Sequence, residues 1–277
     1  MTNHRLIKQS KQAVFYLFIV VLIVLWAFPV LWVIVSSFKL DRLIISQELV
    51  FLFKPTLEHY QRIFTTHNFG RFLVNSLIVA TGTTAVVLIT AFLASYSLSR
   101  YRTGGNFAIV GIMVTRIAPP AAVLMPFFIL FKSFHLINTL TALIVVNISL
   151  NLSFGLLMLK SFIDEIPVSI EEAAQIEGAS WLQTLAMIIF PLARSGIVTT
   201  SIFTFIFTWN EYLFAMVLAS SNKVKTLPVA AGDFVTAYAV EWGPVFSSGT
   251  LILVPVLVLT LFVQRYIVKG LTFGAVK

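Results

Sequence analysis

Polar and charged side chains interrupt three otherwise apolar stretches of this sequence, and their chemistry needs an explanation. Asn147 and Asn151 lie four residues apart, so they share one face of a helix. Arg116 and the pair Asn210-Glu211 place polar and charged groups inside apolar runs. Such groups are costly in hydrocarbon and therefore face a protein interior or a water-filled pathway. The amides suit hydrogen bonds to the hydroxyl groups of a neutral solute, whereas Arg116 and Glu211 would also suit ion coupling.

Each of these residues also has a structural interpretation. The two amides could form hydrogen bonds between helices, and Arg116 could be paired inside a helix bundle. We expect Glu211, the only acidic residue within an apolar span, to face the bundle interior, with Arg116 as the first candidate partner. Asn210 and Glu211 are adjacent and point about 100° apart, so they cannot share the centre of one face.

Other chemistry is excluded by residue types and spacing. The chain has no Cys, its four His residues are dispersed, and neither an H-E-x-x-H nor a G-x-S-x-G motif occurs. We therefore expect no catalytic residue and no metal site. No Gly is followed by Lys, so the chain has no P-loop, and ATP, if it is used, must be bound by another subunit.

The composition of the 277 residues places the chain in a membrane. Hydrophobic residues make up 58% and charged residues 11%, which is more apolar surface than one core of this size can bury. A soluble enzyme, a disordered protein and a fibrous protein are excluded. The net charge of +8 comes from cations at the ends of apolar runs, where they anchor membrane proteins, so we expect no nucleic-acid partner.

Six apolar runs are long enough to cross a bilayer as helices. We expect one all-α transmembrane domain over residues 1–277. The predicted spans are 13–38, 72–99, 106–131, 133–159, 196–218 and 242–263, with a tail over 264–277.

The first span predicts the orientation. Arg5, Lys8 and Lys11 precede it, which favours a cytoplasmic N-terminus, and an even number of spans places the C-terminus on the same side. The run is too long for the apolar part of a signal peptide, so we expect an uncleaved helix.

Two long connections carry helix signals. After the first span, Pro55-Thr56 precedes apolar residues at helical spacing, which predicts a short interfacial helix beginning near Thr56. The second connection, 164–191, is predicted to form two short helices joined at Gly178, which can adopt a left-handed conformation. A rigid corner of this kind is typical of a docking element for a partner protein. The expected capping boxes are Ser169 with Glu172 and Ser180 with Gln183.

This segment resembles the EAA signature of the permeases of ABC importers. The matching pattern is Glu172-Ala173-Ala174, three residues, Gly178, nine residues, Ile188, one residue and Phe190-Pro191. Phe190 departs from the Leu that the family usually has before this Pro.

Other motifs resemble the carbohydrate, or maltose-type, branch of these permeases. His59 stands where Asn is commoner in that branch. The matching segments are Pro55–Tyr60, Asn75–Leu77, Pro119-Pro120, Leu136–Thr139, Trp209–Glu211 and Gly270–Lys277.

The resemblance implies a type I ABC importer permease fold with six transmembrane helices and a cytoplasmic coupling helix. It implies a multi-pass protein of the inner membrane, with both termini cytoplasmic, that translocates a sugar or oligosaccharide. The expected partners are two ATPase subunits that bind ATP and Mg, a second homologous permease, an extracytoplasmic binding protein and membrane lipid. The alternative is a secondary transporter or channel for a small polar solute.

The resemblance also assigns roles to residues of this chain. Ser169, Glu172, Ala173, Ala174 and Gly178 are expected to couple the permease to the ATPases, with helix Ser169–Glu177 acting as a lever. The tail residues Gly270, Gly274 and Lys277 are expected to contact the ATPases as well. Asn147, Asn151, Asn210, Glu211 and Arg116 are the candidates for the substrate pathway.

Overall fold

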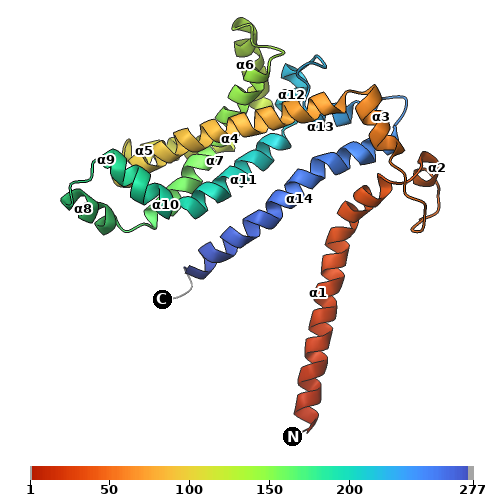
Figure 1. The fold of residues 1–277 in the computed structure, drawn as a ribbon, viewed down its shortest axis with the longest axis horizontal. Coiled ribbons are helices and arrows are strands. Elements are labelled where there is room, and N and C mark those ends of the chain that lie inside the picture. Colours follow the sequence, from red (N-terminus) through yellow and green to blue (C-terminus); the bar gives the residue numbers. More distant parts are fainter. Residues whose placement is uncertain (1, 274–277) are drawn as a thin grey trace. The chain divides into compact units, whose positions relative to one another are not determined.

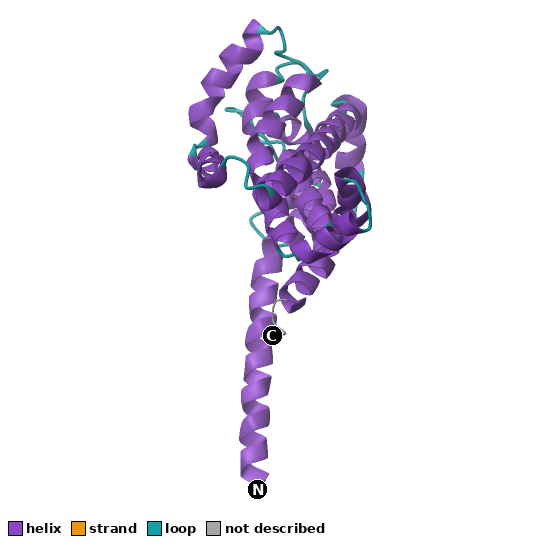
Figure 2. Ribbon diagram, turned by 90° about the vertical axis from the view of Figure 1, so that its left-hand side faces the viewer, coloured by secondary structure: helices purple, strands orange, loops and turns teal. Residues whose placement is uncertain are grey.

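The computed structural model of this protein describes the backbone of residues 2–273 and the side chains of residue 12 and residues 14–264. Within these residues the chain consists of helices joined by loops, with one isolated β-bridge between Val235 and Val240 (Figures 1 and 2). In chain order the helices are α1 (Thr2–Ser36), α2 (Asp41–Ile44), α3 (Glu58–Thr66), α4 (Phe69–Arg100), α5 (Gly105–Ile117), α6 (Pro120–Ser133), α7 (Leu140–Asp164), α8 (Val168–Ile176), α9 (Trp181–Gln183), the π-helix η1 (Thr184–Ile189), α10 (Phe190–Leu192), α11 (Arg194–Trp209), α12 (Leu213–Leu218), α13 (Leu227–Gly232) and α14 (Trp242–Phe273).

Four of the helices contain segments long and apolar enough to cross a membrane by themselves. These segments are Val14–Ser36, Phe69–Arg100, Leu140–Asp164 and Trp242–Gln264. Two bent pairs, Gly105–Ile117 with Pro120–Ser133 and Trp181–Leu192 with Arg194–Trp209, raise the number to six if each pair is one span. The fold is therefore that of an all-α membrane protein, as the composition predicts.

The chain divides into two compact units, which we describe separately. The first contains Met1–His67 and Ala231–Leu251, and the second contains Asn68–Ala230 and Ile252–Lys277.

In the first unit, α3 is anchored to the segment that follows α1. The ring of His59 is buried and its Nε2 lies 2.8 Å from the backbone oxygen of Lys39, while the Tyr60 hydroxyl lies 2.8 Å from that of Ser37. Arg62 on the same helix forms an ion pair with Glu241 at 2.6 Å. The predicted interfacial helix is thus present, two residues later than expected, and it packs through His59 as well as through its apolar residues.

The second unit is organised around α4, α7 and α11, which pack side by side (Figure 1). Gly155 of α7 lies where the three helices meet: a Cβ at this position would come within 2.9 Å of Val87 and 3.6 Å of Thr200. Ser95 of α4 donates a hydrogen bond of 2.8 Å to the backbone oxygen of Leu156. Small residues at helix crossings allow backbones to approach closely, as is usual in membrane bundles.

Two apolar clusters fill the opposite ends of this unit. One joins the C-terminal half of α4 to α7 and η1 through residues such as Phe92, Leu159 and Ile189. The other joins α7, α6 and α12, with Leu143 and Phe214 in its centre. The long helices therefore connect the segment around α8 with the segment around α12 and α13, as Figure 1 shows.

The third predicted span is broken. The sequence predicted one helix over 106–131, but α5 ends at Ile117 and α6 begins at Pro120, with an angle of 95° between them. Ala118 is extended at φ −62° and ψ 121° because the residue before a proline avoids the helical region. Pro120 occupies the first turn of α6, where its missing N–H is tolerated.

Other predicted boundaries also differ. A turn over 134–139 separates α6 from α7, so α7 runs from Leu140 to Asp164 rather than over 133–159. The predicted span 196–218 is interrupted after Trp209, where Asn210 and Glu211 leave the helix before α12. The last helix continues through Pro255 to Phe273, past its predicted end at 263.

Candidate coupling corner and substrate pathway

The corner between α8 and α9 is a glycine-terminated helix end. Gly178 has a φ of +88°, its N–H donates to the oxygen of Gln175 at 3.0 Å, and the N–H of Ala179 donates to the oxygen of Ala174 at 3.0 Å. These two bonds define a Schellman motif, which satisfies the last carbonyl groups of a helix and needs a left-handed residue at this position. The conformation predicted for Gly178 is confirmed.

One of the two predicted capping boxes is present. Ser180 accepts a bond from the N–H of Gln183 at 3.3 Å, and the Gln183 side chain accepts one from the N–H of Ser180 at 2.8 Å. The prediction of a capping box between Ser169 and Glu172 is wrong. Helix α8 already begins at Val168 with Pro167 as the N-cap residue, so Ser169 lies inside the first turn and cannot cap it.

The faces of α8 separate two neighbouring carboxylates. Glu172 and Ala173 are exposed, whereas Glu171 and Ala174 are the buried residues of the helix. Glu171 accepts hydrogen bonds from the Tyr96 hydroxyl at 2.9 Å and from Arg100 Nε. Sequence reasoning missed Glu171. The sequence signal for its burial was its i, i+3 spacing from Ala174, which places both residues on one face of the helix.

Apolar side chains are exposed around this corner. Ile176 is 87% exposed, and Trp181, Leu182 and Met187 are also exposed. Beside them, a hollow of about 310 Å³ lies between the corner at Gly178 and the π-helix η1. Exposed apolar groups that gather on a rigid corner indicate a surface for a protein partner.

The two asparagines of α7 are buried against neighbouring helices. Asn147 and Asn151 each donate a hydrogen bond of 2.9 Å to the backbone oxygen four residues earlier in α7. Asn151 also lies 3.4 Å from the Thr208 hydroxyl of α11. The Oδ1 atom of Asn147 is buried and has no hydrogen-bond partner among the described residues. An acceptor left in this state needs water or a ligand.

Asn210 and Glu211 form the break between α11 and α12. The amide of Asn210 donates to the oxygen of Ile206 at 2.8 Å, and Glu211 accepts bonds from the N–H groups of Phe214 at 2.7 Å and Ala215 at 3.0 Å. Glu211 thus caps α12 from a half-buried position. The suggested ion pair with Arg116 is absent from the described residues.

Arg116 lines a separate hollow of about 500 Å³ with Thr115, Phe127, Ser149 and Ser153. Its guanidinium lies over the ring of Phe154, 5.3 Å from the ring centre. The hydroxyls of Thr115 and Ser153 lie 2.7 Å apart and place Arg116 near the middle of α7. The hollow has the size of a small-molecule site, and a cation, hydroxyl groups and aromatic rings together suit a polyhydroxylated solute.

The remaining sequence predictions concern metals and the tail. No group of side chains that could hold a metal ion occurs among the described residues. Gly270, predicted to lie in a tail beyond the membrane, is part of α14. Gly274 and Lys277 lie outside the described residues.

Comparison with known proteins shows the family of the chain. The family described as "Binding-protein-dependent transport system inner membrane component" matches residues 87–273. The diacetylchitobiose uptake system permease protein DasC of Streptomyces coelicolor is 32% identical over 93% of this chain and 94% of its own length. The trehalose/maltose transport system permease protein MalG of Thermococcus litoralis is 31% identical, with the same coverage of 93% and 94%.

A solved structure shows the same fold. A bacterial ABC transporter involved in the import of the acidic polysaccharide alginate superposes with a TM-score of 0.78 at 20% identity, over 93% of this chain and 96% of that chain. The packing of α4, α7 and α11 with α8 at one end is thus the fold of an ABC importer permease. The chain belongs to the family of binding-protein-dependent transport system inner membrane components, which are multi-pass permeases of ABC importers.

Proposed function

We propose that this chain is one permease subunit of an ATP-driven importer for a sugar or oligosaccharide. The rigid corner of α8 and α9 with its exposed apolar side chains is the observation that carries the proposal. Two separate ATPase subunits bind ATP and Mg, and one of them docks on this corner from the cytoplasm. Ser169, Glu172, Ala173, Ala174 and Gly178 belong to the docking segment, with the exposed Glu172 available to a cation of the ATPase.

A sugar substrate fits both the relatives and the hollow at Arg116. The named relatives are permeases for diacetylchitobiose and for trehalose or maltose. Thr115, Ser149 and Ser153 supply hydroxyl groups, Arg116 supplies N–H donors, and Phe127 offers an aromatic face to the apolar side of a sugar ring. Such a mixture of apolar surface and a few placed polar groups is usual for small-molecule sites.

The other candidates for the pathway have a place in the same proposal. The unpartnered Oδ1 of Asn147 is an acceptor for a solute hydroxyl, and the amide of Asn151 becomes accessible when α7 and α11 separate. The amide of Asn210 is already exposed. Glu211 contributes mainly by holding α12. Gly270, Gly274 and Lys277 stay a proposed ATPase contact.

The chain does not work alone in this proposal. A second homologous permease completes the pathway, and an extracytoplasmic binding protein delivers the solute. Closure of the ATPases moves the corner, and the bundle then exchanges an inward-open for an outward-open state. Both termini lie in the cytoplasm, which agrees with the cations before the first span.

Reconstitution tests this function against the secondary-transporter alternative. The chain is purified with an ATPase, a second permease and a binding protein and placed in liposomes, with radiolabelled trehalose and diacetylchitobiose as probes. We expect uptake of a probe only with ATP on the ATPase side and binding protein on the opposite side. Uptake driven by an ion gradient without ATP would overturn the proposal.

A further inference from the structure

The C-terminal end of α4 is tied to α8 by a buried ion pair. Arg100 Nε binds one carboxylate oxygen of Glu171, and the side chains are 9% and 5% exposed. The Tyr96 hydroxyl donates to the other oxygen at 2.9 Å, and Arg100 Nη2 donates to the backbone oxygen of Ile166 at 2.9 Å. Both oxygens of the carboxylate are thus held by α4, and the guanidinium also holds the segment that leads into α8.

This ion pair is a buried polar contact between α8 and α4, and α8 also packs on η1. Of the nine residues of α8, Glu171 and Ala174 are buried, and an alanine side chain makes only a small apolar contact. A buried ion pair adds little net stability compared with apolar packing, but it fixes geometry because either charge left alone is strongly unfavourable. The pair therefore determines where α8 lies on α4 more than how stable the protein is.

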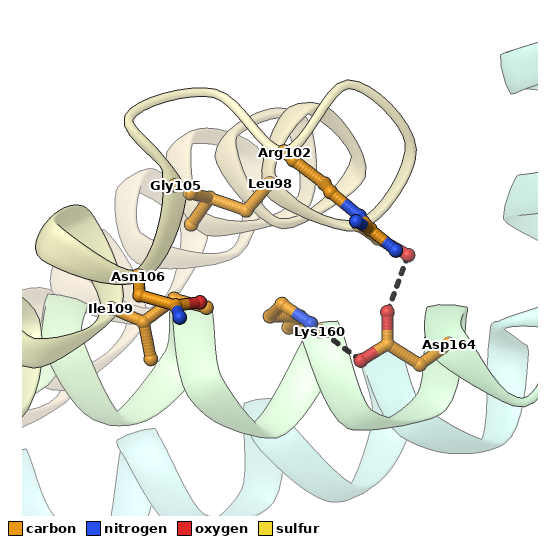
Figure 3. Close-up of a pocket in the computed structure, with 8 residues that line it drawn as sticks. Leu98, Arg102, Gly105, Asn106, Ile109, Lys160 and Asp164 are labelled. Carbon is orange, nitrogen blue, oxygen red and sulfur yellow. Dashed lines mark hydrogen bonds and ion pairs between the residues drawn. The ribbon is translucent and has the colours of Figure 1, made fainter.

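A second polar link continues from Arg100 to α7. Arg100 Nη1 donates to the Ser99 hydroxyl at 3.1 Å, and the Ser99 hydroxyl donates to Asp164. Lys160 donates to the other oxygen of Asp164 at 2.6 Å, so that Asp164 is held from both sides (Figure 3). Two cations and two carboxylates alternate along this chain of contacts, which joins the ends of α4 and α7 to α8.

A displacement of α8 is consequently transmitted to the bundle at the end of α4. Since Tyr96, Ser99 and Arg100 all belong to its last two turns, α4 cannot stay in place while α8 moves unless these bonds break. The helix then carries the displacement along the α4–α7 crossing, where Gly155 and Ser95 allow close contact.

We propose that Arg100 and Glu171 form the joint through which α8 moves α4, and that they are positioning residues for energy coupling. This inference rests on the proposed function, because it requires that an ATPase moves α8. It assigns different roles to two adjacent carboxylates: Glu171 faces the bundle and transmits the movement, whereas Glu172 faces outward toward the ATPase.

The test uses the full complex in liposomes, with ATP hydrolysis measured with and without its binding protein. Glu171→Gln and Arg100→Gln each remove one charge of the joint, and a double variant removes both. Glu165→Gln is the control, since it removes an exposed carboxylate from the same connection. Arg100→Lys keeps the charge, but its single ammonium cannot reach Glu171 and the Ile166 oxygen in the same geometry.

We expect the joint variants to co-purify with their partners and to retain basal ATP hydrolysis. Stimulation by the binding protein should fall at least about fivefold, the lower end of usual coupling energies. The double variant should lose no more of this stimulation than the single variant that loses more. Stimulation of Arg100→Lys should lie between those of the wild type and Arg100→Gln, and Glu165→Gln should be stimulated like the wild type.

Three results would overturn the joint. In the first, Glu171→Gln retains full stimulation. In the second, all joint variants, Arg100→Lys included, lose assembly, basal hydrolysis and stimulation in parallel. This result would show that the ion pair has a purely structural role. In the third, the unmodified complex shows no stimulation at all, which would refute the proposed function and the joint with it.

Discussion

Replacement of Gly178 by alanine should weaken ATPase docking through backbone strain alone. A Cβ at this position would meet nothing within 4 Å, so no steric clash contributes. The φ of +88° is a left-handed conformation, which costs an L-residue roughly 1–2 kcal/mol. If the corner relaxes to avoid this cost, the Schellman bonds of Gly178 and Ala179 are lost and α8 frays at its end.

The expected size of the effect follows from this strain. If docking requires the native corner, a strain of about 1–2 kcal/mol corresponds to roughly a 5- to 30-fold loss of affinity for the ATPase. Gly178→Asn should lose less affinity for the ATPase than Gly178→Ala, because asparagine tolerates the left-handed region. Gly178→Val should lose more affinity than Gly178→Ala, because valine is β-branched.

The assay is a titration of the detergent-purified permease with its ATPase. Gly111→Ala is the matched control, since Gly111 lies within α5 and a Cβ there also meets nothing within 4 Å. Wild-type affinity of Gly178→Ala, or equal losses for Gly178→Asn and Gly178→Val, would refute the reasoning.

Four further substitutions test the local geometry. Gly196→Ala places a Cβ 2.4 Å from the ring of Phe162, so overpacking of about 1–3 kcal/mol should lower the thermal unfolding temperature, and an unchanged temperature would contradict this packing. Glu211→Ala removes the cap of α12 and should lower the stability of this helix by about 1 kcal/mol. The loss should appear as faster hydrogen exchange at Phe214 and Ala215, and unchanged exchange would contradict the capping role. Ser180→Ala should weaken the start of α9 by a similar amount of about 1 kcal/mol, measured by exchange at Gln183, whereas Ser169→Ala, which removes no cap, should leave α8 unchanged.

Features that depend on nearby residues could be predicted from the sequence. The conformation of Gly178 and the box of Ser180 with Gln183 are set within a few residues, and both are confirmed. The pattern of Ser169 with Glu172 misled because Pro167, with its fixed φ, begins the helix before Ser169 can cap it. Pro119-Pro120 was visible as an interruption, but the 95° bend depends on how α6 packs on α7 and α12.

Features that depend on distant residues could not be predicted. Glu171 binds Arg100, which is 71 residues away, and only the packed bundle brings the two together. The shared face of Asn147 and Asn151 follows from their spacing, but their burial beside Thr208 does not. Arg116 was only the first candidate partner of Glu211, and the structure instead satisfies this carboxylate with backbone N–H groups of α12.

Cross-linking from the corner of α8 tests the central claim most directly. The chain contains no cysteine, so Ile176→Cys provides a single exposed thiol for a photoreactive cross-linker, and Tyr238→Cys provides one at the fully exposed Tyr238. In the assembled complex we predict an adduct between the permease and the ATPase from position 176 and none from position 238. An ATPase adduct from position 238 without one from position 176 would contradict the claim that the permease is coupled to the ATPase through α8.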